Sequence, residues 1–213
     1  MLEDVLLIQD KHREAASIIV SEILERKDKE KYIVAISGES GSGKSELTHV
    51  VAKELFNKGI KVKPVHIDNF YNTHPLERQE FRKKHGVENV VGLGEYLWDD
   101  INKTVQKFYN NEKASMPCVD LVTQNIDTLT TDFNGVEVLV VDGLYAINIE
   151  GVDLGVFIEL TYHETKKAQS NRGKEKTDEL RFKVLEQEHQ TVLGLKPKAD
   201  LLINMDYKVV KVK

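Results

Sequence analysis

The chain has 213 residues, a length that predicts one compact domain, or one domain with a small inserted lid. With 40% hydrophobic and 31% charged residues it can bury an ordinary core, which excludes disordered, collagen-like and low-complexity architectures. The 30 basic and 35 acidic residues leave a net charge of −5, which argues against a protein that grips nucleic acid through its phosphates. The single cysteine, Cys118, excludes an intrachain disulfide and a zinc site built from thiolates.

The start of the chain carries no pattern typical of export. Residues Met1–Asp4 lack the basic segment of a signal peptide, and the apolar run Val5–Ile8 is too short for its hydrophobic region. No stretch approaches the ~20 apolar residues needed to span a bilayer. We therefore expect a cytoplasmic protein with no membrane partner.

Hydrophobic spacing predicts the order of helices and strands. Apolar residues at three- and four-residue steps predict an amphipathic helix over residues 2–27, and we expect residues 1–31 to pack against the main domain at 32–213. A buried strand is predicted at 32–36, and further strands at 61–67, 136–141, 156–160 and 199–203. Helical patterns occur at 47–55, 76–84, 95–109 and 164–192, and the region at 69–134 is mostly polar. This alternation predicts an α/β fold with a central parallel sheet covered by helices on both faces.

The strongest motif follows the first predicted strand directly. It fits the pattern G-x-x-x-x-G-K-[ST], and the nucleotide-binding residues that it predicts are Gly38, Glu39, Ser40, Gly41, Ser42, Gly43, Lys44 and Ser45. Its glycines let backbone N–H groups cradle phosphate oxygens, and the dipole of the following helix favours the anion. Lys44 can reach the β- and γ-phosphates, and the Ser45 hydroxyl can ligate Mg²⁺. The motif predicts a P-loop NTPase fold.

Two aspartates end neighbouring apolar strands, where open α/β sheets place their ligands. Asp142 follows the strand at 136–141 and could hold Mg²⁺ together with Ser45. Asp68 follows the strand at 61–67 and could accept the proton of an acceptor hydroxyl as that oxygen attacks phosphorus. Tyr71, three residues further on, is predicted to face the cleft and contact the acceptor.

These motifs together resemble the uridine kinase/phosphoribulokinase family of P-loop kinases over nearly all of residues 32–205. The resemblance includes the loop at 38–45, Asp68-Asn69-Phe70-Tyr71, Val141-Asp142-Gly143-Leu144, the segment Met116–Asp120 and the lid triplet Arg172-Gly173-Lys174. It implies ATP as donor, Mg²⁺ as cofactor, a hydroxyl of a nucleoside or similar small molecule as acceptor, Asp68 as base, and a basic lid at about 163–192.

The charge of the predicted lid agrees with that implication. Between Lys166 and Lys183, seven basic residues face three acidic ones, so the segment carries a local charge of +4. Cations that close over a triphosphate would stabilise the charge that develops during phosphoryl transfer. Arg172 is therefore predicted as a catalytic residue, with Lys167 and Lys174 as nucleotide-binding residues.

The chain departs from uridine kinases where that family reads its pyrimidine. Val119 replaces a tyrosine, Gln124 a base-contacting histidine, and Glu164 aligns with a lid arginine. The family's substrate segment is replaced by Glu95–Asp99, in which Tyr96, Trp98 and Asp99 are the predicted acceptor contacts, with packing as the alternative role for Trp98. Buried donors without partners weaken binding, so these exchanges leave the nucleobase unsupported.

Alternative functions follow from the same motifs. A kinase for a non-nucleoside alcohol, such as a sugar or a pantothenate-like molecule, differs only in the acceptor site. A non-catalytic nucleotide-dependent regulator would bind ATP without phosphorylating an acceptor. GTP specificity is disfavoured because Asn102-Lys103-Thr104-Val105 lacks the aspartate that reads guanine. The sequence is also compatible with a homo-oligomer. His66 is expected to be a core or cleft-edge residue.

Overall fold

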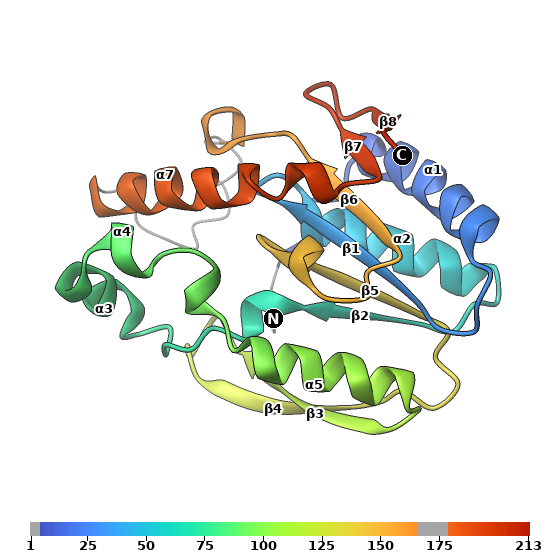
Figure 1. Ribbon diagram of the computed structural model, residues 1–213, viewed down its shortest axis with the longest axis horizontal. Coiled ribbons are helices and arrows are strands. Elements are labelled where there is room, and N and C mark those ends of the chain that lie inside the picture. The colour runs from blue at the N-terminus through green and yellow to red at the C-terminus, as the bar shows by residue number, and fades with distance from the viewer. Residues whose placement is uncertain (1–4, 166–178) are drawn as a thin grey trace.

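A computed structural model describes residues 5–165 and 179–213 (Figure 1). Its main sheet has the strand order β2-β5-β1-β6-β7-β8, in which only β8 runs antiparallel to its neighbour. The strands are β1 (Tyr32–Gly38), β2 (Val62–His66), β3 (Lys113–Val119), β4 (Ile126–Asp132), β5 (Val138–Gly143), β6 (Leu154–Ile158), β7 (Leu201–Ile203) and β8 (Val209–Lys211). The α-helices are α1 (Asp10–Arg26), α2 (Lys44–Asn57), α3 (Arg78–His85), α4 (Val87–Val90), α5 (Trp98–Tyr109) and α7 (Glu179–Leu193). The short 3-10 helices are η1 (Ile67–Asn69), η2 (Leu93–Glu95), η3 (Ala146–Asn148) and η4 (Lys196–Lys198).

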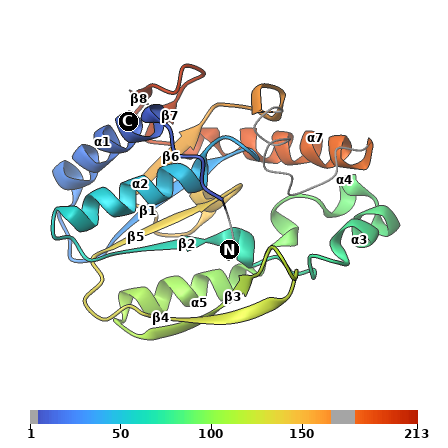
Figure 2. The ribbon, with the colours of Figure 1, turned by 180° about the vertical axis from the view of Figure 1, so that it is seen from behind.

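Helices cover the two faces of the sheet, and each face has its own apolar core. On one face α1 and α2 pack side by side over β1, β5 and β6, as the view from behind shows (Figure 2). On the other face α5, η3 and the last turn of α7 bury residues such as Phe108, Tyr145 and Val192. Every residue of β1 and β5 is buried, which explains why these strands are continuous apolar runs rather than alternating ones.

The α/β fold with a mostly parallel, helix-covered sheet is confirmed, and two features differ from the prediction. The first helix begins at Asp10 rather than near residue 2, with Gln9 and His12 forming a reciprocal cap. Within the polar region at 69–134, β3 and β4 form an antiparallel hairpin that the sequence pattern did not predict. Six of the seven residues of β4 are exposed, so this strand lacks the hydrophobic alternation by which a strand is recognised.

Three parallel strands bring the predicted site residues to one edge of the sheet. In the register of β1 and β5, Ile36 lies opposite Asp142, and in that of β2 and β5, His66 lies opposite the same aspartate. The phosphate loop follows β1, and Asp68 follows β2 by two residues. Among the described residues, no helix combines the length and hydrophobicity that crossing a membrane requires.

Candidate active site

The phosphate loop forms a tight turn between β1 and α2. Gly41 and Gly43 have φ angles of +78° and +94°, a region that glycine enters without strain. The N–H of Ser42 and the Nζ of Lys44 both donate to the carbonyl of Glu39, at 3.2 and 2.8 Å. Gly43, which precedes α2, offers no side chain to cap the helix, so its first amides can bind an anion.

Asp142 lies beside the loop, at the end of β5. Its carboxylate is 2% exposed and forms an ion pair with His66. Burial alone would raise the pKa of Asp142, but the charges of His66 and Lys44 and a hydrogen bond from Ser45 outweigh it and hold that pKa below its usual value. His66 is thus a partly buried residue at the end of β2 with a charge partner, which its isolated position in the sequence could not reveal.

The oxygens of Ser45 and Asp142 suit Mg²⁺, a hard cation that binds few protein ligands and shares its coordination with phosphates and water. No group of three or more His, Cys, Asp or Glu side chains that could hold a metal ion occurs in the part of the chain that the structure describes. A cation at this place would therefore depend on the oxygens of the nucleotide as well as on the protein.

Asp68 lies next to the tip of β5, close to Asp142. A Cβ atom added to Gly143 would lie 3.2 Å from Oδ1 of Asp68, so the two strand ends are in near contact. The Tyr96 hydroxyl donates a 3.0 Å hydrogen bond to the same carboxylate oxygen. Burial, followed by the charge of Asp68, raises the pKa of Tyr96 well above its ordinary value, so this hydroxyl stays protonated and acts as donor.

Aromatic side chains form one wall beside Asp68. The rings of Tyr71 and Tyr96 lie 4.4 Å apart, and the Trp98 ring lies 5.9 Å from Tyr96. The indole N–H of Trp98 donates to the carbonyl of Leu93 at 2.7 Å, so much of this side chain serves packing. Asp99, in contrast, is exposed and lies among solvent-facing side chains of α5. The structure thus brings Tyr71, Tyr96 and Trp98 to the wall and leaves Asp99 outside it.

A buried arginine–glutamate network, which the sequence did not predict, connects this wall to the phosphate loop. Arg82 donates two hydrogen bonds to Glu95, at 2.7 and 2.9 Å, and Glu188 lies 3.8 Å from Arg82 and 3.6 Å from Arg181. Arg181 in turn donates to the Ser40 hydroxyl at 3.4 Å. These four charged residues are at most 9% exposed. Because they lie in strongly charged segments, no sequence pattern indicates that these side chains are buried.

Glu39 has a second role that its place in the loop did not indicate. Its carboxylate accepts hydrogen bonds from the backbone N–H of Tyr162 and contacts Nδ1 of His189, both at 2.6 Å. The Thr165 hydroxyl also donates to the Ser40 carbonyl at 2.9 Å. Both sides of the predicted lid therefore attach to the phosphate loop. The predicted lid contacts themselves, Lys167, Arg172 and Lys174, lie outside the described residues.

At the positions that would read a pyrimidine, Glu164 and Val119 make other contacts and Gln124 faces solvent. Glu164 accepts hydrogen bonds from the backbone N–H and the hydroxyl of Thr161, at 2.8 and 2.6 Å, which lowers its pKa. Gln124 is exposed in the turn between β3 and β4, with a φ of +59°. Val119 is buried, and its N–H donates to the Asn69 side chain at 3.0 Å.

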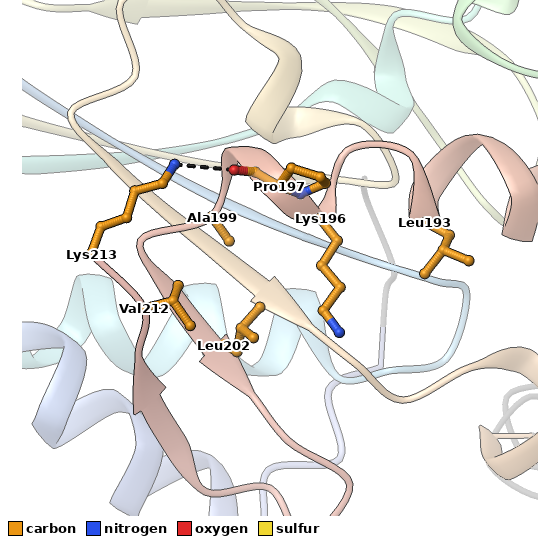
Figure 3. A pocket seen from close by; sticks show the side chains of 7 residues that line it. All are labelled: Leu193, Lys196, Pro197, Ala199, Leu202, Val212 and Lys213. Atoms are coloured by element: carbon orange, nitrogen blue, oxygen red, sulfur yellow. Dashed lines mark hydrogen bonds between the residues drawn. The ribbon is translucent and has the colours of Figure 1, made fainter.

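A cavity of about 340 Å³ lies elsewhere, at the opposite ends of the strands (Figure 3). It is lined by Leu193, Lys196, Pro197, Ala199, Leu202, Val212 and Lys213. Ala199 precedes β7 and Val212 follows the antiparallel β8, so this cavity opens where the parallel strands begin. The phosphate loop lies where they end, and the cavity is therefore separate from the site.

The glycine loop after a central strand, the lysine and serine that open α2, and the aspartate at the next strand end define a P-loop nucleotide-binding protein of the kinase type. The model of the Phosphoribulokinase / Uridine kinase family matches residues 33–169, and the chain belongs to this family.

Known relatives agree on this family and differ in what they act on. The chain is 26% identical over 190 residues to the bifunctional alpha-galactosidase/sucrose kinase of Mediterraneibacter gnavus, a match that covers 83% of this chain and 20% of the relative. It is 26% identical over 131 residues to the uridine kinase of Ureaplasma urealyticum, a match that covers 60% of this chain and 61% of the relative. The chain thus spans less than two thirds of either relative. The fold resembles a possible uridine kinase of Bacillus stearothermophilus, with a TM-score of 0.64, 16% identity, and 89% and 97% of the two chains covered.

Proposed function

We propose that this protein transfers the γ-phosphoryl group of ATP to a hydroxyl group of a small molecule. The observation that carries the proposal is the position of Asp68, which accepts a hydrogen bond from Tyr96 and lies beside Gly143, the residue that follows Asp142 at the end of β5. In this reaction the acceptor oxygen forms a bond to the γ-phosphorus while the bond from that phosphorus to the β,γ-bridging oxygen breaks. ADP leaves, and the hydroxyl proton passes to Asp68.

The remaining residues have binding and positioning roles in the proposal. The loop amides and Lys44 bind the phosphates, and Arg172, Lys167 and Lys174 are proposed to add positive charge around them. Ser45 and Asp142 would hold Mg²⁺, which supplies charge neutralisation at the phosphate oxygens when bound. Such a site works mainly through orientation and electrostatics rather than through covalent chemistry.

The test compares Lys44→Ala with Asp68→Asn. Both should abolish phosphoryl transfer, with a loss of about 10²- to 10⁴-fold for removal of the base. Only Lys44→Ala should markedly weaken ATP binding, measured by calorimetric titration. Asp127→Asn, at an exposed carboxylate of β4, is the matched control and should change neither quantity. An equal loss of ATP affinity in both site variants would remove Asp68 from its assigned role.

The acceptor itself is a separate question within this proposal. A uridine kinase-like nucleoside acceptor is supported by the family and by the Ureaplasma relative. A non-nucleoside alcohol is favoured by the side chains at the base-reading positions, because Glu164 is engaged with Thr161 and Gln124 faces solvent. The sucrose kinase relative, whose match covers 83% of this chain, supports the same choice.

A panel of nucleosides and of neutral and anionic non-nucleoside alcohols, scored by ADP release and by the mass of the product, decides between these acceptor classes. Preference for a nucleoside would overturn the non-nucleoside choice. ATP binding without phosphorylation of any panel member would instead favour the nucleotide-dependent regulator.

A further inference from the structure

Three arginines lie around the aromatic wall, and Arg78 differs from the other two. Arg82 and Arg181 each contact buried glutamates. Arg78 forms no ion pair with any carboxylate among residues 5–165 and 179–213, although acidic residues outnumber basic ones in this chain. Arg78 and Arg82 are four residues apart on α3, which places them on the same side of that helix. A half-buried cation that is left without a counter-charge beside an acceptor site calls for an explanation.

The position of Arg78 links it to Asp68 through two rings. Its guanidinium lies 3.6 Å from the centre of the Tyr71 ring, which is itself 4.4 Å from Tyr96, the residue that donates to Asp68. Stacking of this kind holds a guanidinium flat and leaves its edge donors for a ligand. Arg78 is thereby linked to the proposed base through the rings of Tyr71 and Tyr96.

Three buried donor atoms near this stack lack hydrogen-bond partners within the described residues. The Nε of Arg78, the Oγ1 of Thr73 and the hydroxyl of Tyr145 are all buried, and none has a hydrogen-bond partner within the described residues. The Thr73 carbonyl meanwhile accepts a 3.3 Å hydrogen bond from the Arg78 Nη2, which ties the two residues together. Buried polar groups are normally satisfied, and a set composed of one guanidinium and two hydroxyls matches a ligand rich in acceptor oxygens.

We propose that the acceptor of this kinase carries an oxyanion, a carboxylate or a phosphate, at the end remote from the reacting hydroxyl, and that Arg78 binds it. The inference rests on the proposed function and names its substrate class. Arginine recognises both oxyanions through paired N–H donors, whereas a neutral alcohol leaves its charge uncompensated. Arg78 is half-buried at the first turn of α3, so a modest rotation of its side chain suffices to meet a ligand.

The experiment uses acceptors matched except for charge: glycerol, glycerate and glycerol 3-phosphate, and likewise glucose, gluconate and glucose 6-phosphate. Transfer from ATP should be at least about tenfold more efficient, as kcat/KM, for an anionic member than for its neutral counterpart. Comparison of the carboxylate and phosphate members identifies which oxyanion is bound. Arg78→Gln should abolish this preference by raising the KM for the anion while the KM for ATP is unchanged. Lys84→Gln, at an exposed cation of the same helix, should keep the preference.

Binding is measured separately, so that failure of this inference and failure of the proposed function can be distinguished. Trp98 is the only tryptophan and lies beside Tyr96, so its fluorescence reports on the acceptor site. The anionic probes should produce a saturable change in the wild type that Arg78→Gln removes. Saturable binding without transfer would support the inference and overturn the proposed function. Transfer that favours the neutral members, or an equal effect of Arg78→Gln on both classes, would overturn the inference and leave the proposed function standing.

Discussion

The two halves of the site are built in different ways. The phosphate loop is one run of eight residues, and its internal hydrogen bonds, such as Lys44 to the Glu39 carbonyl, join residues at most five positions apart. The acceptor side is assembled from separate segments: Asp68 lies in η1, Tyr96 directly follows η2, and Glu188 lies in α7. A local turn is specified by a short motif, whereas an assembled wall depends on the whole fold.

This difference has a consequence for what each half can recognise. In the proposed function the loop would bind phosphate mainly through backbone amides, so many side-chain changes elsewhere would leave its chemistry intact. In the proposed function the acceptor wall would recognise its ligand through side chains such as Tyr71 and Arg78, each of which can be exchanged singly. Within one family, donor chemistry is therefore retained while acceptors diverge, as a sucrose kinase and a uridine kinase among the relatives illustrate.

The largest effect on the nucleotide half is expected from Gly43→Ala. At φ +94° a new Cβ would lie 2.6 Å from the Tyr207 hydroxyl and 2.8 Å from Nε2 of His12, so both strain and collision would displace the loop. ATP affinity, measured by titration calorimetry, should fall by at least about 100-fold.

Gly59→Ala is the control for this variant. Gly59 has a φ of +84°, but a Cβ there would meet nothing within 4 Å. It should therefore cost only about 1–2 kcal/mol of stability and leave ATP affinity unchanged. An equal loss of ATP affinity in the two variants would show that the loss does not come from the collision with His12 and Tyr207.

The same contrast explains what could be predicted from the sequence. The phosphate loop, Asp68 and Asp142 could be located because each lies at or just after the end of a predicted strand, and parallel strands bring their carboxyl ends to one edge. The Arg82–Glu95 pair could not be predicted, because nothing in a charged helix indicates that one of its arginines is buried. Its partner lies 13 residues away, and only tertiary packing sets that contact. The β3–β4 hairpin was missed because solvent covers most of β4 and removes its periodic signal.

On the acceptor half, Arg82→Ala should have the largest effect on stability. Burial opposes the charge of Arg82, but its hydrogen bonds to Glu95 and the nearby Glu188 raise its pKa, so the guanidinium stays charged. Removing it leaves two buried glutamates without that counter-charge, which should lower the free energy of unfolding by about 3–5 kcal/mol in urea titrations. A loss below about 1 kcal/mol would contradict a buried, fully paired network.

The double variant Arg82→Met with Glu95→Met tests whether this loss comes from the uncompensated charge. It replaces both charges with apolar side chains of similar length and should recover most of the stability. Lys84→Ala, at an exposed site of α3, should change stability by less than about 0.5 kcal/mol.

The smallest effect that still distinguishes the acceptor half from the nucleotide half is expected from Tyr96→Phe. It removes the hydroxyl that donates to Asp68 and keeps the ring contacts with Tyr71 and Tyr145. A hydrogen bond to a charged group contributes about 1.5–3 kcal/mol, so loss of this orientation should lower kcat about tenfold. The KM for ATP should not change, because no contact of Tyr96 reaches the phosphate loop among the described residues.

Tyr109→Phe provides the comparison for this substitution, since its hydroxyl donates to Gly151 at 3.4 Å at the far end of α5. It should leave kcat within about twofold of the wild type. If Tyr96→Phe retains full kcat, the tyrosine serves packing alone and Asp68 is oriented by the backbone of η1. If it raises the KM for ATP as strongly as it lowers kcat, the acceptor wall and the phosphate loop act as one unit, and the division between a locally encoded half and an assembled half does not extend to catalysis.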